Sequence, residues 1–287
     1  MQKHLYLLLA AFIAVFPLSC KEDTNTPDEP QLVFRFKFDP NQPRLNSFGQ
    51  PAPVPAGHAA QSPSFNSISA HYVELTPGIF TQVGQGQVLY VAPETTQGGS
   101  KAIDFSKSKI VAENEVFLSI PLKDIAPGQY PYVRISLAYQ NYDIEVNALG
   151  FTVTGTLASF IGYNTYINAF NIKNNQVTVN SNKSQGYWGF ESAYGVIEGQ
   201  APAGATTVPN PLAATSPIPP GSCLVTGQFD QALTISGDET EDIEVEVSLS
   251  VNNSFEWIET GGNTLYQPLE GDAVVDMGIR GMTARVK

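Results

Sequence analysis

Cysteine, histidine and methionine are scarce in this 287-residue sequence, which has two, three and three of them. Cys20 ends an N-terminal leader, so Cys223 has no partner for an intrachain disulfide once Cys20 is lipidated. Only Met277 and Met282 follow the leader, which excludes a methionine-rich site for a soft metal. We therefore expect Cys223 to be a small buried apolar side chain.

Positive charge is also scarce. The sequence has 15 Lys and Arg residues and 27 Asp and Glu residues, which gives a net charge of −12. An acidic surface repels polyanions before they come into contact with it. The sequence therefore predicts no nucleic-acid partner and argues against polyphosphate ligands and anionic membrane surfaces.

Residues 184–279 contain no Lys or Arg, whereas Asp and Glu occur 14 times there. The densest group, residues 238–242, leads into a predicted strand whose outward residues include Glu244 and Glu246. Like charges at this spacing repel one another, so a bound cation or a basic partner would relieve the strain. The alternative is a solvated acidic face that keeps the protein soluble.

Helical periodicity is nearly absent beyond the leader, and apolar residues instead alternate with polar ones. Strands are predicted at residues 32–38, 87–92, 116–120, 133–137, 151–157, 166–172, 176–180, 223–229, 243–251 and 273–279. Gly, Pro and Asn clusters separate them, as turns require. One buried and one wet face per strand predict an all-β protein, an antiparallel β-sandwich.

Two proline-rich stretches, at about residues 45–66 and 201–222, interrupt the strand pattern. Only residues 223–287 follow the second stretch, too few strands to bury two sheets by themselves. We therefore expect one large β-sandwich domain over residues 31–287, with these two stretches as long surface loops.

The N-terminus carries a leader. An apolar run at residues 5–16 has the length of a signal-peptide core and is too short to span a bilayer of about 30 Å. It ends in PLSC at residues 17–20, which resembles a bacterial lipobox apart from its proline. The sequence thus predicts a lipoprotein signal peptide over residues 1–19 and lipidation of Cys20. An ordinary secretory leader cut near the same place is the alternative.

Residues 20–30 are polar and interrupted by proline, which predicts a flexible acidic tether. Lys21, Glu22 and Asp23 directly follow the cysteine and resemble the surface-export signal of Bacteroidota-type lipoproteins. That resemblance implies a lipid anchor in the outer membrane and display on the cell surface. A periplasm-facing anchor with a merely solvated linker is the alternative.

A twelve-residue segment from Glu259 to Glu270 has the length of a calcium loop, with Asn263 at its fifth position and Asp272 just beyond it. Gly261 offers no side-chain oxygen at the third position, and the flanks resemble strands instead of helices. The two interpretations are a calcium site formed by Glu259, Asn263, Glu270 and Asp272, and an ordinary hairpin loop.

Aromatic residues are densest at Tyr187, Trp188, Phe190 and Tyr194. Exposed on a loop, these rings would stack on sugar faces, whereas buried rings would fill the sandwich core. The group is therefore a candidate binding site for a glycan, with core packing as the alternative.

No catalytic residue is predicted. His58 and His71 are the only histidines after the leader, and no Gly-x-Ser-x-Gly nucleophile motif occurs. Paired carboxylates for hydrolysis depend on a separation in space that the sequence does not give.

Several segments resemble the methanobactin-associated periplasmic protein (MbnP-like) family of β-sandwiches, whose relatives include lipoproteins of unknown role. The similar segments are residues 65–75, residues 122–130 ahead of the strand at 133, and residues 188–194, in the family's order. The resemblance implies the β-sandwich fold and an association with copper, but this sequence has no histidine after Trp188, where the family places one. Residues 255–257 and 274–281 also resemble uncharacterised Bacteroidota-type lipoproteins.

These observations predict a membrane-anchored, exported lipoprotein that acts as a noncatalytic binding or interaction module, for a glycan or another surface protein. The alternatives are a metal-binding MbnP-like lipoprotein that uses copper or calcium, and a hydrolase that acts on exported polymers.

Overall fold

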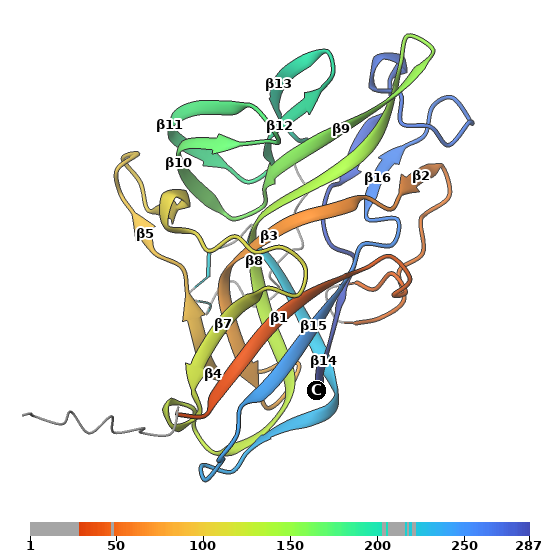
Figure 1. The fold of residues 1–287 in the computed structure, drawn as a ribbon. Coiled ribbons are helices and arrows are strands. Elements are labelled where there is room, and N and C mark those ends of the chain that lie inside the picture. Colours follow the sequence, from red (N-terminus) through yellow and green to blue (C-terminus); the bar gives the residue numbers. More distant parts are fainter. Residues whose placement is uncertain (1–28, 47–48, 203–204, 206–215, 217, 220–221) are drawn as a thin grey trace, which may run out of the picture.

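A computed structural model describes residues 29–46, 49–202, 205, 216, 218–219 and 222–287. The predicted signal peptide, Cys20 and the export signal Lys21, Glu22 and Asp23 lie outside the described residues, as does much of the stretch at 201–222. The described residues form three β-sheets joined by turns and short 3-10 helices (Figure 1).

The strands divide among the sheets as follows. The eleven-stranded sheet contains β13 (Gly195–Gln200), β12 (Tyr187–Ser192), β9 (Phe151–Phe160), β8 (Gly128–Ala148), β14 (Cys223–Ile235), β18 (Met282–Val286), β15 (Ile243–Ser250), β1 (Gln31–Asp39) and β7 (Val116–Pro121), with β3 (Ser64–Thr76) paired to β8 and β4 (Gln87–Val91) paired to β3. The four-stranded sheet contains β11 (Gln176–Ser184), β10 (Asn164–Asn171), β6 (Ala102–Asp104) and β5 (Glu94–Thr95), and the three-stranded sheet contains β17 (Ala273–Asp276), β16 (Phe255–Ile258) and β2 (His58–Gln61). The 3-10 helices are η1 (Phe105–Lys107), η2 (Leu122–Asp124) and η4 (Pro268–Glu270).

The prediction of an all-β sandwich is confirmed. Most strand pairs are antiparallel, but β1 with β15, β14 with β18, and β10 with β6 are parallel, so two of the sheets are mixed. Strand alternation predicts which face is buried and carries no information on strand direction.

The predicted loop at 45–66 needs correction. It contains β2 and the first residues of β3. β2 pairs with β16, which lies far along the chain, so its neighbour could not be inferred from the local sequence.

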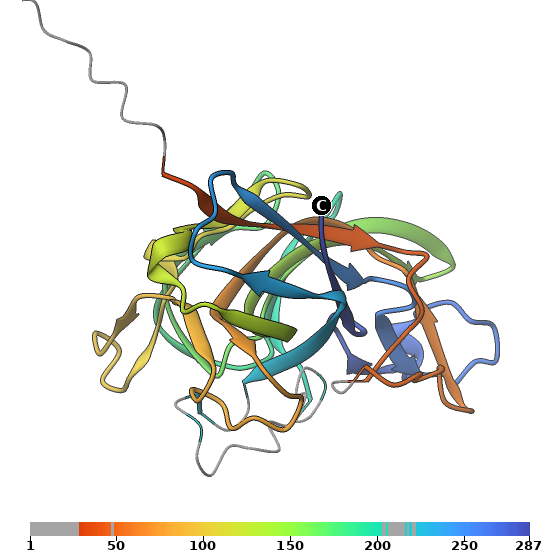
Figure 2. The ribbon, with the colours of Figure 1, turned by 90° about the horizontal axis from the view of Figure 1, so that it is seen from below.

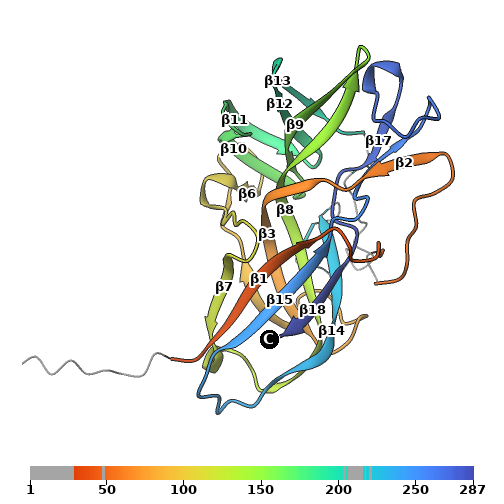
Figure 3. The same ribbon diagram turned by 45° about the vertical axis from the view of Figure 1, so that its right-hand side comes forward.

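The longest strand, β8, joins the two halves of the molecule (Figure 3). Along one edge its first half pairs with β14, up to Leu137, and its second half pairs with β9, from Tyr139 onward. Along the other edge it pairs with β3 as far as Asp143. Beyond that point the side chain of Gln61 bonds both the N–H and the C=O of Glu145, at 2.8 and 2.9 Å. β8 is therefore covered on both edges by partners that change along its length.

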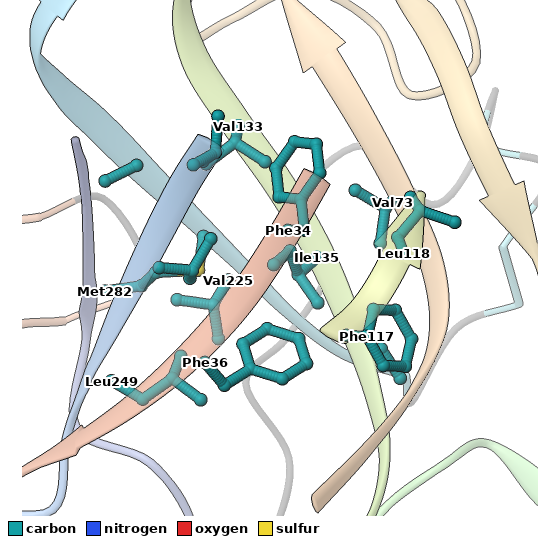
Figure 4. Packing of buried hydrophobic residues seen from close by; sticks show 14 of the residues in the cluster. Phe34, Phe36, Val73, Phe117, Leu118, Val133, Ile135, Val225, Leu249 and Met282 are labelled. Atoms are coloured by element: carbon teal, nitrogen blue, oxygen red, sulfur yellow. The ribbon is translucent and has the colours of Figure 1, made fainter. Parts of the chain in front are cut away.

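The main core lies inside the curl of the large sheet, which wraps around a common interior when it is viewed from below (Figure 2). Phe34 and Phe36 on β1 face Ile135 on β8 and Phe117 on β7, as the alternation predicts (Figure 4). The rings of Phe36 and Phe117 are 4.9 Å apart. Cys223 is free and buried, as expected.

The outward acids of β15 are paired with bases from neighbouring strands. Arg35 on β1 lies 3.5 Å from Glu244, and Arg285 and Lys287 each lie 2.8 Å from Glu246. The sequence count of residues 184–279 missed these bases because strand pairing brings them from the two ends of the chain. Like-charge repulsion along β15 therefore gives no reason for a bound cation.

A buried ion pair between Arg134 on β8 and Glu74 on β3 lies on the outer face of the main core. Arg134 Nη1 is 3.1 Å from Glu74 Oε2, and its Nη2 donates to the carbonyl of Thr81 at 2.8 Å. The other Glu74 oxygen accepts the backbone N–H of Gly84 and Gly86. The pair therefore holds the loop between β3 and β4 against the sheet.

Arg134→Met should lower the free energy of unfolding by about 3–5 kcal/mol, because it leaves the Glu74 carboxylate buried without its counter-charge. The matched change Arg35→Met, in a pair whose side chains are 28% and 43% exposed, should cost less than about 1 kcal/mol. Urea denaturation measures both variants. Equal losses would contradict the assigned role of the buried pair.

Candidate functional site

An apolar pocket of about 310 Å³ lies between β12–β13 and β16–β17, at the end of the molecule where the β8–β9 hairpin projects (Figure 1). Its lining residues are Ile144, Val146, Leu157, Trp188, Phe190, Ile197, Gln200, Ala201, Pro202, Phe255, Tyr266, Pro268, Asp272, Ala273, Val274 and Met277. Only Gln200 and Asp272 among them carry strongly polar side chains. The size and lining fit the burial of a small apolar group.

Alternation along β12 places Trp188 and Phe190 in this pocket. Tyr187 points to the opposite face, where it packs into the cluster that contains Phe160 and Phe170. Tyr194 follows in the β12–β13 turn and is 81% exposed. The structure therefore divides the predicted aromatic group, and only two of its four rings line the pocket.

Two glycines set the orientation of these rings. A Cβ atom added to Gly199, across from Trp188 on β13, would lie 2.3 Å from Cζ2 of that indole. A Cβ at Gly155 on β9 would lie 2.1 Å from Cζ of Phe190. Each ring therefore occupies the space above a strand position that only glycine leaves open.

The opposite wall is built by Phe255 on β16 and Tyr266 in the loop that follows it, with ring centroids 5.1 Å apart. The Tyr266 carbonyl accepts the N–H of Asn147, which fixes the loop to the outer end of β8. Burial, with a smaller contribution from the charge of Asp272, raises the pKa of Tyr266 to about 12. This hydroxyl therefore stays protonated at neutral pH.

Three of the four predicted metal ligands, Asp272, Glu259 and Asn263, accept hydrogen bonds from the loop's own backbone. Asp272 is buried and accepts from Thr260 N and Oγ1 and from Gln267 N, at 2.7–2.9 Å. Glu259 accepts the backbone N–H of Gly261 and Gly262, both at 2.8 Å.

Asn263 donates to Gln267, and Glu270 is exposed in η4. Within the described part of the chain, no group of three or more His, Cys, Asp or Glu side chains is placed to hold a metal ion. The structure thus brings Asp272 to the pocket and does not assemble the four residues into a ligand shell.

Behind the β16–β17 wall lies a buried charge network centred on Glu256. Its Oε2 pairs with Arg44 and with Arg280, the latter at 2.6 Å, and its Oε1 lies 2.5 Å from His58 Nδ1. Arg280 also pairs with Asp276 at 2.9 Å. The three-stranded sheet therefore has one apolar face, toward the pocket, and one charged face, which is packed against the rest of the chain.

Burial acts differently on the two carboxylates of the network. It raises the pKa of Glu256, but hydrogen bonds from His58 and Arg44 and the charge of Arg280 outweigh it and leave this pKa lowered. For Asp276 burial dominates over Arg280 and raises the pKa to about 6. Of these two carboxylates, Asp276 is therefore the one that titrates closer to neutral pH.

The other histidine that follows the leader, His71 on β3, is buried, whereas the His58 side chain is 25% exposed. Its Nε2 lies 3.5 Å from Glu94, which in turn accepts from Tyr163 and pairs with Lys101. Burial lowers the pKa of His71, against the charge of Glu94. His71 and His58 thus occupy separate clusters on β3 and β2.

A larger hollow of about 630 Å³ lies on the outer face of β1, β15, β18 and the start of the β14 bulge. Most of its charged side chains are already paired with one another, as Lys37 is with Asp39 and Arg285 with Glu246, and Asp230 accepts the backbone N–H of Gln231. A pocket whose polar groups are satisfied internally and whose floor is an open sheet face offers a ligand little to bind. The apolar pocket is therefore the better candidate site.

Sequence reasoning missed half of the pocket and the whole charge network. Phe255 and Trp257 alternate with Glu256, a pattern that predicts an ordinary surface acid, yet both faces of β16 are covered. Arg44, 212 residues before Glu256, gives no local sign of its partner.

Comparison with known proteins gave no match: no family model, no curated protein and no solved structure is similar to this chain. Over the described residues, no helix has the length and apolar character needed to cross a membrane.

The free energy of unfolding should depend on pH through the titration of the Asp276 carboxyl. Its pKa is about 6 in the folded chain and about 4 in an unfolded one, so the folded state binds the proton more tightly between these values. This carboxyl therefore costs stability as the pH rises from 4 to 6. The unfolding free energy of the wild type minus that of Asp276→Asn should fall by about 2–3 kcal/mol from pH 4 to pH 7.

Urea denaturation at closely spaced pH values measures this difference, with Asp124→Asn, at the exposed last residue of η2, as the control. A difference that stays flat for Asp276→Asn would contradict the assignment.

Proposed function

We propose that this chain is an exported, membrane-anchored lipoprotein whose β-sandwich acts as a noncatalytic binding module, with the apolar pocket as its ligand site. The pocket's lining carries the proposal. Trp188, Phe190, Phe255 and Tyr266 surround a volume that fits one ring or a short aliphatic group, and Ile197 forms part of its rim.

The chemistry of the pocket supports binding in preference to catalysis. Asp272 is the acid among its lining residues, and hydrogen bonds from the loop backbone occupy both of its oxygens. The Tyr266 hydroxyl, with its raised pKa, is a poor base. A ligand would be held by burial of apolar surface, at about 25 cal/mol per Å².

The proposed location rests on the N-terminal sequence. Lipidation of Cys20 and export through Lys21, Glu22 and Asp23 would anchor the domain in the outer membrane, on the cell surface, through a short polar tether. The likeness to the MbnP-like family agrees with this location and stays a proposal. A periplasm-facing anchor is the alternative.

The two other functions considered from the sequence gain no geometric support. A copper or calcium site would need clustered ligands, and the predicted loop acids bind backbone N–H groups instead. A hydrolase would need a base that is free to act, whereas His58 lies against Glu256 in the charge network.

The pocket should bind the neutral apolar dye N-phenyl-1-naphthylamine with a rise in fluorescence. Ile197→Asp removes an apolar rim residue and adds a charge, so it should weaken dye binding about 10-fold or more. Val91→Asp, on another edge strand, is the matched control, because Val91 is 53% exposed, Ile197 is 60% exposed, and Val91 is outside the pocket. Failure of the wild-type protein to bind the dye would overturn the pocket as a ligand site.

Lipidation is tested separately. In cells that express the full chain, the wild type should incorporate labelled palmitate and fractionate with membranes, and Cys20→Ala should do neither. Protease added to intact cells should degrade the wild type if the anchor places the domain on the cell surface. Palmitate incorporation by Cys20→Ala would contradict the assignment.

A further inference from the structure

The strand at the rim of the pocket, β13, is the terminal strand of the large sheet, and no described strand covers its outer edge. The pairing with β12 determines which residues of β13 direct their backbone N–H and C=O groups toward β12 and which direct them outward. Ala201 N donates to Gly186 O, and the two-residue turn that closes the hairpin makes Ser192 and Gly195 a bonded pair.

Residues of β13 therefore alternate in the direction of their backbone groups. Ile197 and Gly199 bond toward β12, whereas Val196 and Glu198 direct their N–H and C=O groups outward. None of the described residues bonds to these four outward groups. This edge is a ready template for one more strand.

An added strand would continue the wall of the pocket. The side chain of Ile197 lies between the two outward residues and lines the pocket beside Trp188 and Phe190. Because side chains alternate across a strand, every second residue of the added segment would lie on this same face. One apolar side chain of the segment could then enter the pocket, while its backbone bonds the edge.

The charge around the pocket selects the kind of segment. Glu270 is exposed in η4, next to the pocket-lining end of that helix at Pro268, and Glu259 lies in the adjoining loop. Glu198 belongs to the other face of β13, where its carboxylate accepts a hydrogen bond from the Tyr187 hydroxyl. None of the ion pairs that the structure describes joins Glu259 or Glu270 to a base. Lys183, a base on nearby β11, lies over the Tyr187 ring on the opposite face of β12. The pocket face thus presents unbalanced negative charge.

We propose that the open edge of β13 and the adjoining pocket bind an extended polypeptide segment of a partner protein, one with apolar side chains flanked by Lys or Arg. The proposal rests on the proposed function, because it uses the same pocket, and it names the class of ligand. Main-chain hydrogen bonds to Val196 and Glu198 would supply affinity, the pocket would select an apolar residue, and the acidic rim would favour the basic flanks.

The probe is a synthetic peptide, acetyl-Lys-Thr-Val-Thr-Leu-Thr-Lys-amide, titrated calorimetrically into the mature domain. It should bind and displace N-phenyl-1-naphthylamine. The same peptide N-methylated at its three central residues cannot donate to an edge and should bind at least about 10-fold more weakly. Replacing both Lys residues by Glu should also weaken binding about 10-fold at low salt, and the difference should narrow as salt rises.

Two variants test the edge from the protein side. Glu198→Pro and Glu198→Ala both remove the carboxylate, but only proline also removes the outward N–H. The peptide should bind Glu198→Pro at least about 5-fold more weakly than Glu198→Ala. Melting temperatures check that both variants fold, and the N-methylated peptide on the wild-type protein keeps the test independent of them.

The outcomes separate this inference from the proposed function. If the dye binds and the peptide does not, the segment proposal fails and the pocket stands. If neither binds, the pocket fails as a ligand site and the segment proposal fails with it. If the N-methylated peptide binds as tightly as its parent, the edge has no role. A dimer of the wild-type protein that Glu198→Pro dissociates would assign the edge to a second copy of this chain and overturn the proposal.

Discussion

The whole arrangement depends on covering both edges of one strand. β8 runs for 21 residues, and each of its backbone groups needs a partner along that length. β14 and β9 share one edge and β3 covers the other, until β3 ends beside Asp143. Gln61 and the backbone of Tyr266 then substitute for a strand. The chain that completes this edge comes from a separate small sheet, and the pocket lies between that sheet and β9 and β12.

That small sheet has three strands of four residues each, and both of its faces are packed against other parts of the chain. Its apolar face contributes Phe255 and Trp257 to the buried apolar cluster around the pocket, and its other face carries Glu256. Removing one partner of a buried ion group leaves an unpaired charge, so the network around Glu256 fixes one orientation of the sheet. The wall of the candidate site is therefore held from behind by electrostatics and from the front by apolar contact.

Each of the ten strands predicted from the sequence overlaps a strand of the structure, because a period of two needs only local residues to be visible. Other strands, among them β12, β13 and β16, were not predicted. The sequence predicted the pairing poorly, because partners such as Arg35 and Glu244 are 209 residues apart. The aromatic group at 187–194 shows what the local sequence predicts and what it does not. Alternation alone places Tyr187 and Trp188 on opposite faces of their strand. The sequence does not show that the Trp188 face borders a pocket, because the other wall comes from a sheet about 70 residues further along the chain. The glycines opposite the rings, Gly155 and Gly199, were the local signal that the sequence analysis did not use.

The negative charge of the acidic half of the chain is neutralised in some places and not in others. Its acids on β15, β16 and β17 pair with bases, among them Arg35, Arg280 and Arg285, so their field is largely cancelled at short range. Glu259 and Glu270, beside the pocket, have no such pairing among the described residues, so the field there persists over about a Debye length, near 8 Å at physiological salt. The apolar pocket, the open edge of β13 and this uncancelled charge coincide at the same end of the molecule. A neutral apolar ligand would use only the first of these features, whereas a basic extended segment would use all three.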